Sequence, residues 1–338
     1  MHHRPRRPVG AALSLAALSL AALLAASGCT GGTAEPATAA AEEGGWSFTD
    51  DLANTVELDT TPARVAGLND VAASLWNYGI EPVASFGQTS AADDVAFEGR
   101  DLADLEIVGE SYGQIDLERL AAADPDLIVT SVYPVDSTGA LDPSQPLYGF
   151  ESVQQQEQVA RIAPIVAIAY RGSAAEVIER TVELADSLGA DAAVVDAARE
   201  DFEAASAELA AAGERGITVL PVYATASDGW WMGKAPDDPA LRLYSDLGVD
   251  FVDPGGDTYF WETVSWEQVT EYPSDVILYS LRGGETPEQM RAQPTYTLLP
   301  AVQAGQEHPW EYVGMDHVAQ AAYMTELAGW LAEAEEVT

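Results

Sequence analysis

Two segments of the chain share one pattern of polar and apolar positions. Ile115–Tyr133 reads IDLERLAAADPDLIVTSVY and Val264–Arg282 reads VSWEQVTEYPSDVILYSLR, and the two align without a gap at an offset of 149 residues. Each begins near a residue that favours a helix N-cap, Asp116 or Ser265, and a proline ends the short helix that follows. An apolar, β-rich run comes next, which is typical of a strand buried on both faces. Because helix followed by buried strand is the repeating step of a parallel α/β sheet, the repetition predicts two equivalent lobes.

Further apolar runs extend this architecture along the chain. The first half has predicted strands at 64–68, 83–85 and 165–169, and a helix at 70–78. The second half has predicted strands at 217–223 and 250–252, and a helix at 239–247. Glycines directly follow both of these helices, as expected for C-caps.

The middle of the chain, residues 173–212, is helical by composition and period. We predict a break near Gly189 and a long helix that links the two lobes. The predicted fold class is therefore α/β, with two Rossmann-like lobes that have parallel sheets and are joined by a single long α-helix. The predicted boundaries are 46–190 for the N-terminal lobe, 191–213 for the linking helix and 214–338 for the C-terminal lobe.

The N-terminal residues have the pattern of a secretory signal. Three arginines precede an apolar run of Ala and Leu, Val9–Ala26, which closes on Ser-Gly-Cys. The run stops short of the roughly 20 residues that a membrane span needs. The closing residues resemble a lipobox, which implies that Cys29, the single cysteine of the chain, is diacylated and becomes the mature N-terminus. We expect residues 1–28 to be a lipoprotein signal peptide and 29–45 a lipid-anchored flexible tether.

Composition excludes several classes of partner. The chain has 15 Lys+Arg against 55 Asp+Glu, a formal net charge of −40. Nucleic acid is excluded, because phosphate binding depends on Lys and Arg, whereas cationic or neutral ligands are favoured. Beyond the predicted signal there are two histidines, His308 and His317, and no cysteine other than Cys29, so we expect no direct metal site.

The order and spacing of these segments resemble the ferric-siderophore- and cobalamin-type binding lipoproteins of ABC importers, whose two lobes are joined by one long helix. Phe48–Asp51, Val56–Leu58 and Pro62–Val65 are similar to the opening hairpin and first strand of that family. The two repeated segments are similar to its lobe signatures. The resemblance implies a monomer, held on the extracytoplasmic face of the cell membrane through its lipid anchor only. It also implies that the protein has no intrinsic cofactor, binds a ferric siderophore and delivers it to the permease.

The resemblance also implies a role for one glutamate in each lobe. Glu118 and Glu267 occupy equivalent positions in the repeated helices and would pair with arginine-lined docking loops of the permease subunits. A carboxylate in the first turn of a helix also favours the helix dipole by ~0.3–1 kcal/mol. The equivalence of the two positions favours docking.

Ligands of open α/β sheets bind outside the carboxyl ends of the strands, so the residues there are the candidate ligand contacts. They combine aromatic surface with guanidinium donors for oxygen ligands. At least one of the adjacent tryptophans Trp230 and Trp231 should be buried, because the side chains of neighbouring residues in an extended segment point to opposite faces. The candidates are Tyr112, Tyr133, Arg171, Trp230, Trp231, Trp261 and Arg282.

The cargo and an enzymatic alternative remain open at this level. A ferric siderophore, of hydroxamate type, is favoured, and cobalamin or haem are the alternatives within the same family. Gly109–Gly113 also matches the G-x-S-x-G pattern of serine hydrolases, with Ser111 as nucleophile and His317 as a candidate base. A nucleophile elbow enters its helix directly, whereas here the helix begins only after the Asp116 cap. We therefore expect no enzyme and no catalytic residues.

Overall fold

The computed structural model describes residues 45–338. The predicted signal peptide (1–28), the lipidation site Cys29 and nearly all of the predicted tether (29–45) lie outside the described residues. No helix within 45–338 combines the length and the apolar character that a membrane crossing requires.

The N-terminal lobe is built on a five-stranded parallel sheet with strand order β5-β4-β3-β6-β7. Every residue of the central strands β3 and β6 is buried, as expected for strands covered on both faces. The strands are β3 (Val65–Leu68), β4 (Ala84–Phe86), β5 (Glu106–Ile107), β6 (Leu127–Val132) and β7 (Ile165–Ala169). The helices are α1 (Asn69–Asn77), η1 (Ala91–Asp93), η2 (Val95–Phe97), α2 (Leu117–Ala122), α3 (Val153–Val159) and α4 (Ala174–Ser187).

The C-terminal lobe contains a six-stranded sheet with the order β11-β9-β8-β12-β13, in which β10 also pairs with β8. The strands are β8 (Thr218–Thr225), β9 (Gly229–Gly233), β10 (Asp250–Phe251), β11 (Trp261–Val264), β12 (Val276–Ser280) and β13 (Glu307–Trp310). The helices are η3 (Ala235–Asp237), α6 (Pro239–Asp246), η4 (Trp266–Glu271), α7 (Pro287–Met290), η5 (Tyr296–Leu298), α8 (Pro300–Ala304) and α9 (His317–Glu333).

The prediction of a parallel sheet is correct for the first lobe and wrong in part for the second. Strand β9 runs antiparallel to β8, and β11 runs antiparallel to β9, so the second sheet is mixed. The cause is a tight turn between β8 and β9, in which the Asp228 backbone N–H donates to Thr225 Oγ1 (2.9 Å). Gly229 follows with a φ of +99°, a conformation that favours glycine. An Asp-Gly pair between two apolar runs is a hairpin signal, which requires antiparallel strands.

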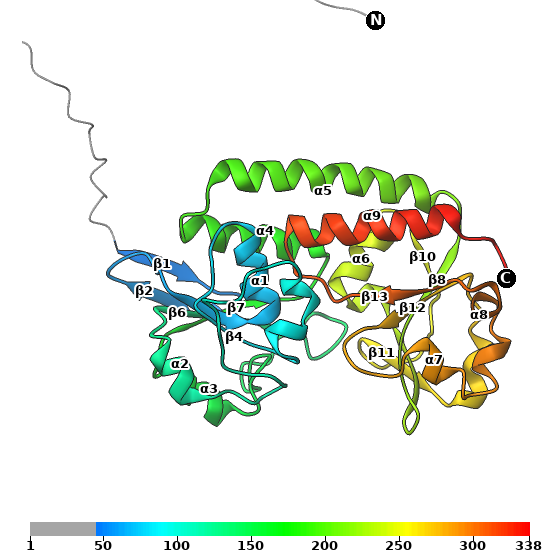
Figure 1. The fold of residues 1–338 in the computed structure, drawn as a ribbon, viewed down its shortest axis with the longest axis horizontal. Coiled ribbons are helices and arrows are strands. Elements are labelled where there is room, and N and C mark those ends of the chain that lie inside the picture. Colours follow the sequence, from blue (N-terminus) through cyan, green and yellow to red (C-terminus); the bar gives the residue numbers. More distant parts are fainter. Residues whose placement is uncertain (1–44) are drawn as a thin grey trace, which may run out of the picture. The chain divides into compact units, whose positions relative to one another are not determined.

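The predicted linking helix is present as α5 (Ala192–Gly213). Asp191 caps its N-terminus by accepting from the Ala193 backbone N–H at 2.9 Å. Figure 1 shows α5 passing over both lobes, with α9 alongside it. Small side chains such as Ala205 are buried in this helix, which allows α9 to pack closely. The link between the lobes is therefore a pair of packed helices rather than an isolated one.

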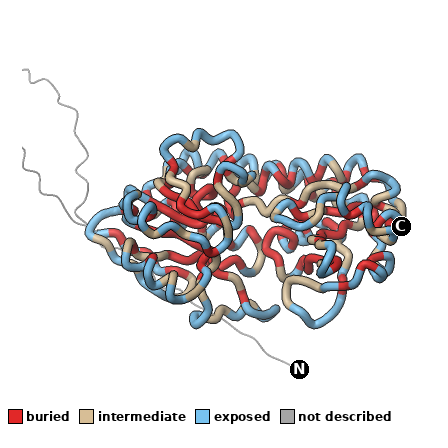
Figure 2. Tube along the Cα trace, turned by 60° about the horizontal axis from the view of Figure 1, so that its bottom comes forward, coloured by how far each residue is buried: buried red, intermediate tan, exposed pale blue. Residues whose placement is uncertain are grey.

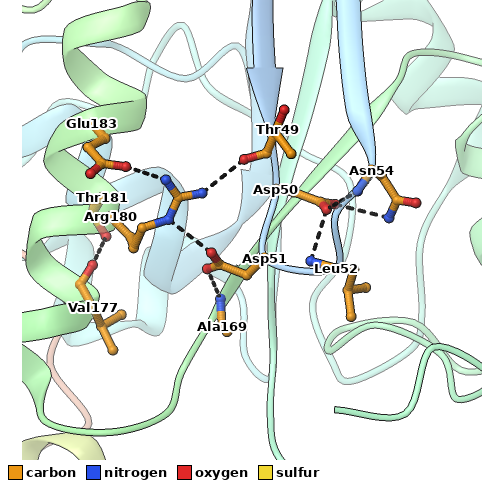
Figure 3. A network of polar contacts seen from close by, with 10 residues as sticks. All are labelled: Thr49, Asp50, Asp51, Leu52, Asn54, Ala169, Val177, Arg180, Thr181 and Glu183. Atoms are coloured by element: carbon orange, nitrogen blue, oxygen red, sulfur yellow. Dashed lines mark hydrogen bonds and ion pairs between the residues drawn. The ribbon is translucent and has the colours of Figure 1, made fainter.

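An N-terminal hairpin, β1 (Trp46–Thr49) and β2 (Thr55–Leu58), is attached to the first lobe through Arg180 and through Trp46, whose Nε1 donates to the Ser187 carbonyl at the end of α4 (3.0 Å). Arg180 of α4 binds the Asp51 carboxylate (2.9 Å), the Thr49 carbonyl (3.0 Å) and Glu183 (Figure 3). Asp51 in turn accepts from the Ala169 backbone N–H at the end of β7 (2.7 Å). The predicted opening hairpin is thus confirmed.

Burial follows the sheets and the inner faces of the helices, while the loops and outer helix faces are exposed (Figure 2). The two repeated segments form corresponding elements of the two lobes, at the predicted offset of 149 residues. Helix α2 corresponds to η4 and strand β6 to β12, each beginning 149 residues apart. The prediction that both lobes contain the same helix–strand unit is therefore confirmed.

The repeat also places an aspartate just before the repeated strand of each lobe, β6 and β12. Asp126 Oδ2 accepts from the backbone N–H groups of Ala63 and Arg64, both at 3.0 Å. Asp275 is almost fully buried and accepts five hydrogen bonds, from the backbone and hydroxyl of Thr218 and of Thr338 and from the backbone N–H of Val337. Asp275 therefore connects β8 to the C-terminal segment.

We predict that Asp275→Asn lowers the free energy of unfolding at neutral pH by about 2–3 kcal/mol, because a buried charged acceptor of several hydrogen bonds is lost. Asp126→Asn is the matched control and should cost under about 1 kcal/mol, because Asp126 is exposed.

Although burial opposes ionisation, the hydrogen bonds lower the pKa of Asp275 below its ordinary value. Its contribution is therefore present above pH ~4 and lost as the pH falls further. Urea denaturation at several pH values would check this, and an Asp275→Asn deficit that persists at pH ~2 would contradict it.

Candidate functional site

A cavity of about 580 Å³ lies between the lobes, where the carboxyl ends of their parallel strands face each other. Tyr133 follows β6 and Tyr170 follows β7 in the first lobe. Arg282 follows β12 and Tyr312 follows β13 in the second. The other lining residues are Asp70, Gln88, Tyr148, Tyr223, Trp231, Asp238, Pro239, Ala240, Tyr259, Phe260, Trp261, Trp310, Glu311, Val313 and Met315.

Aromatic rings form a continuous wall on the C-terminal side of this cavity. The ring of Phe260 is 5.0 Å from that of Trp261, centre to centre, and Trp261 is 5.7 Å from Trp310. Trp310 stacks on Tyr312 at 4.5 Å. Such a wall offers a large, rigid apolar contact surface at a small cost in conformational entropy.

A second aromatic group lines the N-terminal side. The ring of Tyr133 lies 4.9 Å from Tyr148 and 5.4 Å from Tyr170, in edge-to-face arrangements. Burial raises the pKa of all three phenols, so they remain neutral and can donate hydrogen bonds to oxygen atoms of a ligand. The cavity thus presents flat apolar surfaces together with hydroxyl donors.

Lys234, at the end of β9, holds the loop that supplies part of the aromatic wall. Its Nζ donates to the carbonyls of Gly256 (3.1 Å) and Thr258 (2.7 Å) and lies 3.5 Å from a Glu262 carboxylate oxygen. Phe260, at the end of this loop, has a φ of +66°, a strained value for a residue with a side chain. The Phe260 backbone is held by two further bonds, from its N–H to Asp237 Oδ2 (3.0 Å) and from the Lys234 N–H to its carbonyl (2.9 Å).

Helix α1 of the first lobe contacts the second lobe at both of its ends. At its N-terminus, Asp70 forms an ion pair with Arg282. At its C-terminus, Asn77 donates to Asp316 Oδ1 (3.0 Å), and the Tyr78 hydroxyl lies 3.0 Å from Nδ1 of His317. Burial lowers the pKa of His317 to about 4, so its neutral ring is able to accept from Tyr78.

The Asp70–Arg282 pair lies within the cavity wall. Arg282 Nη2 also donates to the Tyr312 carbonyl at 3.1 Å, and the guanidinium carbon is 5.1 Å from the centre of the Tyr312 ring. Burial raises the pKa of Asp70, although Arg282 acts in the opposite direction. Burial would lower the pKa of Arg282, but the neighbouring Asp70 raises it above the ordinary value.

Two further carboxylates face the cavity. Asp238 is almost fully buried and caps α6 by accepting from the Leu241 backbone N–H at 2.9 Å. Burial raises the pKa of Asp238 to about 6 and also raises that of Glu311. The wall therefore carries desolvated negative charge, which a positive group in the cavity would stabilise.

Four of the candidate ligand residues line this cavity: Tyr133, Trp231, Trp261 and Arg282. The Nε1 donor of Trp231 is buried without a hydrogen-bond partner among residues 45–338. A buried donor without a partner raises the free energy of the folded protein, so an acceptor on a ligand would gain free energy by bonding to it.

The remaining candidates lie elsewhere. Trp230 is fully buried in the core, 5.6 Å from the ring of Trp266, so its prediction as a ligand contact is corrected: neighbouring side chains of β9 point to opposite faces, and Trp231 takes the cavity face. Arg171 lines a separate cavity of about 320 Å³, together with Arg242. Tyr112 is exposed and reaches the main cavity only through its contact with Tyr148 (5.4 Å).

Several lining residues were missed from the sequence, although some carried a signal. Asp70 lies two residues after the end of β3, in the first turn of α1, and Tyr170 lies directly after β7; the strand-end rule covers both positions. Tyr148, Tyr259 and Phe260 come from loops whose path depends on tertiary contacts, so no local pattern indicates them.

The other predicted sites have these surroundings. Glu118 and Glu267 are exposed, in the first turns of α2 and η4. Ser111 lies in a loop six residues before α2 begins, and His317 is buried against Tyr78, so the described structure has no nucleophile elbow. Within residues 45–338, no group of three or more His, Cys, Asp or Glu is placed to hold a metal ion.

Comparisons with known proteins agree with this architecture. A sequence model described as "Periplasmic binding protein" matches residues 79–306. The crystal structure of DesE, a ferric-siderophore receptor protein from Streptomyces coelicolor, is 31% identical to this chain with a TM-score of 0.77, and the match covers 87% of this chain and 100% of DesE. No match was found among curated proteins.

Two other solved structures are also similar. The siderophore periplasmic binding protein from the fuscachelin gene cluster of Thermobifida fusca is 25% identical, with a TM-score of 0.57 over 80% of this chain and 96% of that chain. The siderophore-binding protein FhuD from Vibrio cholerae is 21% identical, with a TM-score of 0.58 over 80% of this chain and 99% of that chain, and it shares the fold.

The family match covers more than half of the chain, and DesE exceeds 30% identity over most of it. The resemblance inferred from the sequence and the two-lobed α/β class are therefore confirmed. These relatives are binding proteins and not enzymes, which excludes the hydrolase alternative at Ser111. The chain belongs to the periplasmic binding protein family.

Proposed function

We propose that this protein captures a ferric siderophore in the cavity between its lobes. The observation that carries the proposal is the cavity itself, with phenol donors on one side and an aromatic wall on the other. A ferric siderophore is a bulky complex whose surface combines apolar linkers with oxygen acceptors, and such a lining suits both. The likeness to DesE, described as a ferric-siderophore receptor protein, supports the same cargo class.

Within this class we favour a hydroxamate-type complex. The net charge of −40 favours a neutral or cationic cargo over an anionic one. Haem has less support, because the lining residues within 45–338 include no histidine that could ligate its iron. Cobalamin, the other alternative, is an outcome of the titration below.

We further infer that the protein is a lipid-anchored component of an ABC importer. The lipobox-like sequence at Cys29 supports an anchor on the extracytoplasmic face of the cell membrane. Glu118 and Glu267 are exposed at equivalent positions of the two lobes, which suits docking onto two permease subunits with positively charged loops. Hydrogen bonds from its own backbone N–H and from the Ser265 side chain lower the pKa of Glu267, which favours the ionised carboxylate.

Ligand binding can be measured through tryptophan fluorescence. Three tryptophans line the cavity, so a ferric complex should quench the emission strongly, with a dissociation constant in the micromolar range or tighter. Titration with ferric hydroxamates, ferric catecholates, haem and cobalamin would identify the cargo. No response to any ferric siderophore would contradict the proposal.

The variant Trp231→Ala should weaken binding by about 2 kcal/mol, or roughly 30-fold in Kd, because it removes a central aromatic contact and a free N–H donor. Calorimetry is the suitable measurement, since the fluorescence itself changes. Trp330→Ala is the matched control: Trp330 stacks on His308 (4.7 Å) outside the cavity and should leave Kd unchanged. Equal losses in both variants would place the ligand elsewhere.

Docking is tested by reversing one charge in each lobe. Glu118→Lys and Glu267→Lys should each reduce cellular uptake of radioactive iron complex several-fold while leaving its Kd unchanged, because neither side chain lines the cavity. Glu203→Lys, an exposed site on α5 with the same charge change, is the control. Normal uptake in the double variant of Glu118 and Glu267 would refute docking through these residues.

A further inference from the structure

The cavity between the lobes contains four charged side chains. Among the described residues that line it, Arg282 is the single cation, whereas Asp70, Asp238 and Glu311 are carboxylates. With all four ionised, the lining has a formal charge of −2. A bound complex meets this charge at short range and among aromatic rings, where electrostatic interactions are stronger than in water.

Arg282 would be the natural donor for an anionic cargo, but its charge is already compensated. Asp70 pairs with the Nη2 end of its guanidinium, which also donates to the Tyr312 carbonyl. Releasing Arg282 for a ligand would leave Asp70 buried without a partner and would break a contact between the lobes. The pair therefore removes the positive charge that an anion needs.

The other two carboxylates are not compensated in this way. Neither Asp238 nor Glu311 forms an ion pair with a side chain in the described part of the chain. Burial raises the pKa of both groups, which means that their ionised forms are destabilised in the empty cavity. The indole rings of Trp231, Trp261 and Trp310 also line the cavity, and aromatic rings attract cations.

We propose that Asp70 is a specificity-determining residue, which by neutralising Arg282 makes the cavity prefer a positively charged ferric complex to an anionic complex of the same shape. This deepens the function proposed above and rests on it. The preferred cargo class is a ferric trihydroxamate that carries a pendant ammonium group. Complexes with free carboxylates, or with three doubly ionised catecholates, are disfavoured.

A series of complexes with the same ferric centre and a different charge at one terminus tests this, and the two acylated forms control for the added bulk. A linear ferric trihydroxamate with a terminal ammonium group is compared with its N-acetylated, neutral form and its N-succinylated, anionic form, each titrated against the full chain. The ammonium form should bind about tenfold or more tightly than the succinylated form at low ionic strength. The preference should shrink in about 1 M salt, because salt screens charges.

Three variants separate charge from packing. Asp70→Asn changes the formal charge of the lining from −2 to −1 and frees Arg282, so the preference for the ammonium form should fall by about tenfold. The double variant Asp70→Asn with Arg282→Gln removes one charge of each sign and should keep the original preference. Asp238→Asn also reduces the negative charge while retaining a residue that caps α6, and it should lower the preference without disturbing the ion pair.

The outcomes distinguish this inference from the function on which it rests. Equal affinities for the three forms of the complex, or the same loss of preference in Asp70→Asn and in the double variant, would overturn the role of Asp70. If Asp70→Asn does not fold, an unchanged preference in Asp238→Asn overturns the charge selection. Failure of every ferric complex to bind would instead overturn the proposed siderophore function.

Discussion

Helix α1 belongs to one lobe but is bonded to the other at both of its ends. The Asp70–Arg282 ion pair joins its first turn to the residues after β12, and Asn77 and Tyr78 join its last turn to the start of α9. Because α9 also packs along the linking helix α5, the lobes are held by connected helices as well as by a single covalent crossing. The shape of the cavity depends on these contacts, since its two sides come from different lobes.

The same contacts connect stability with recognition. Arg282 is placed where a ligand could reach it, yet it is held by Asp70 and by the Tyr312 carbonyl. An arginine that served only to bind a ligand would have a free guanidinium, and an arginine that served only to stabilise the fold would not line the cavity. Because Arg282 lines the cavity, one ion pair contributes both to the contact between the lobes and to the charge of the cavity.

The aromatic wall is built in a different way, from strand ends on one side and a strained loop on the other. Trp310 and Tyr312 follow from the end of β13, whereas Phe260 depends on the bonds that Lys234 makes with the preceding loop. A wall held in place before the ligand arrives loses little conformational entropy on binding. This is consistent with a site that recognises a rigid, bulky complex by shape and selects among such complexes by charge.

The sequence by itself determined the two lobes, the repeated helix–strand unit and the long linking helix, because capping residues, prolines and buried apolar runs act locally. It also placed Tyr133 and Arg282 at strand ends that prove to face the cavity. Only the tertiary structure decided that Trp231 rather than Trp230 faces the cavity, and that Asp70 forms an ion pair with Arg282. These features depend on which face of a strand meets the core and on contacts between residues 212 positions apart, which no local pattern encodes.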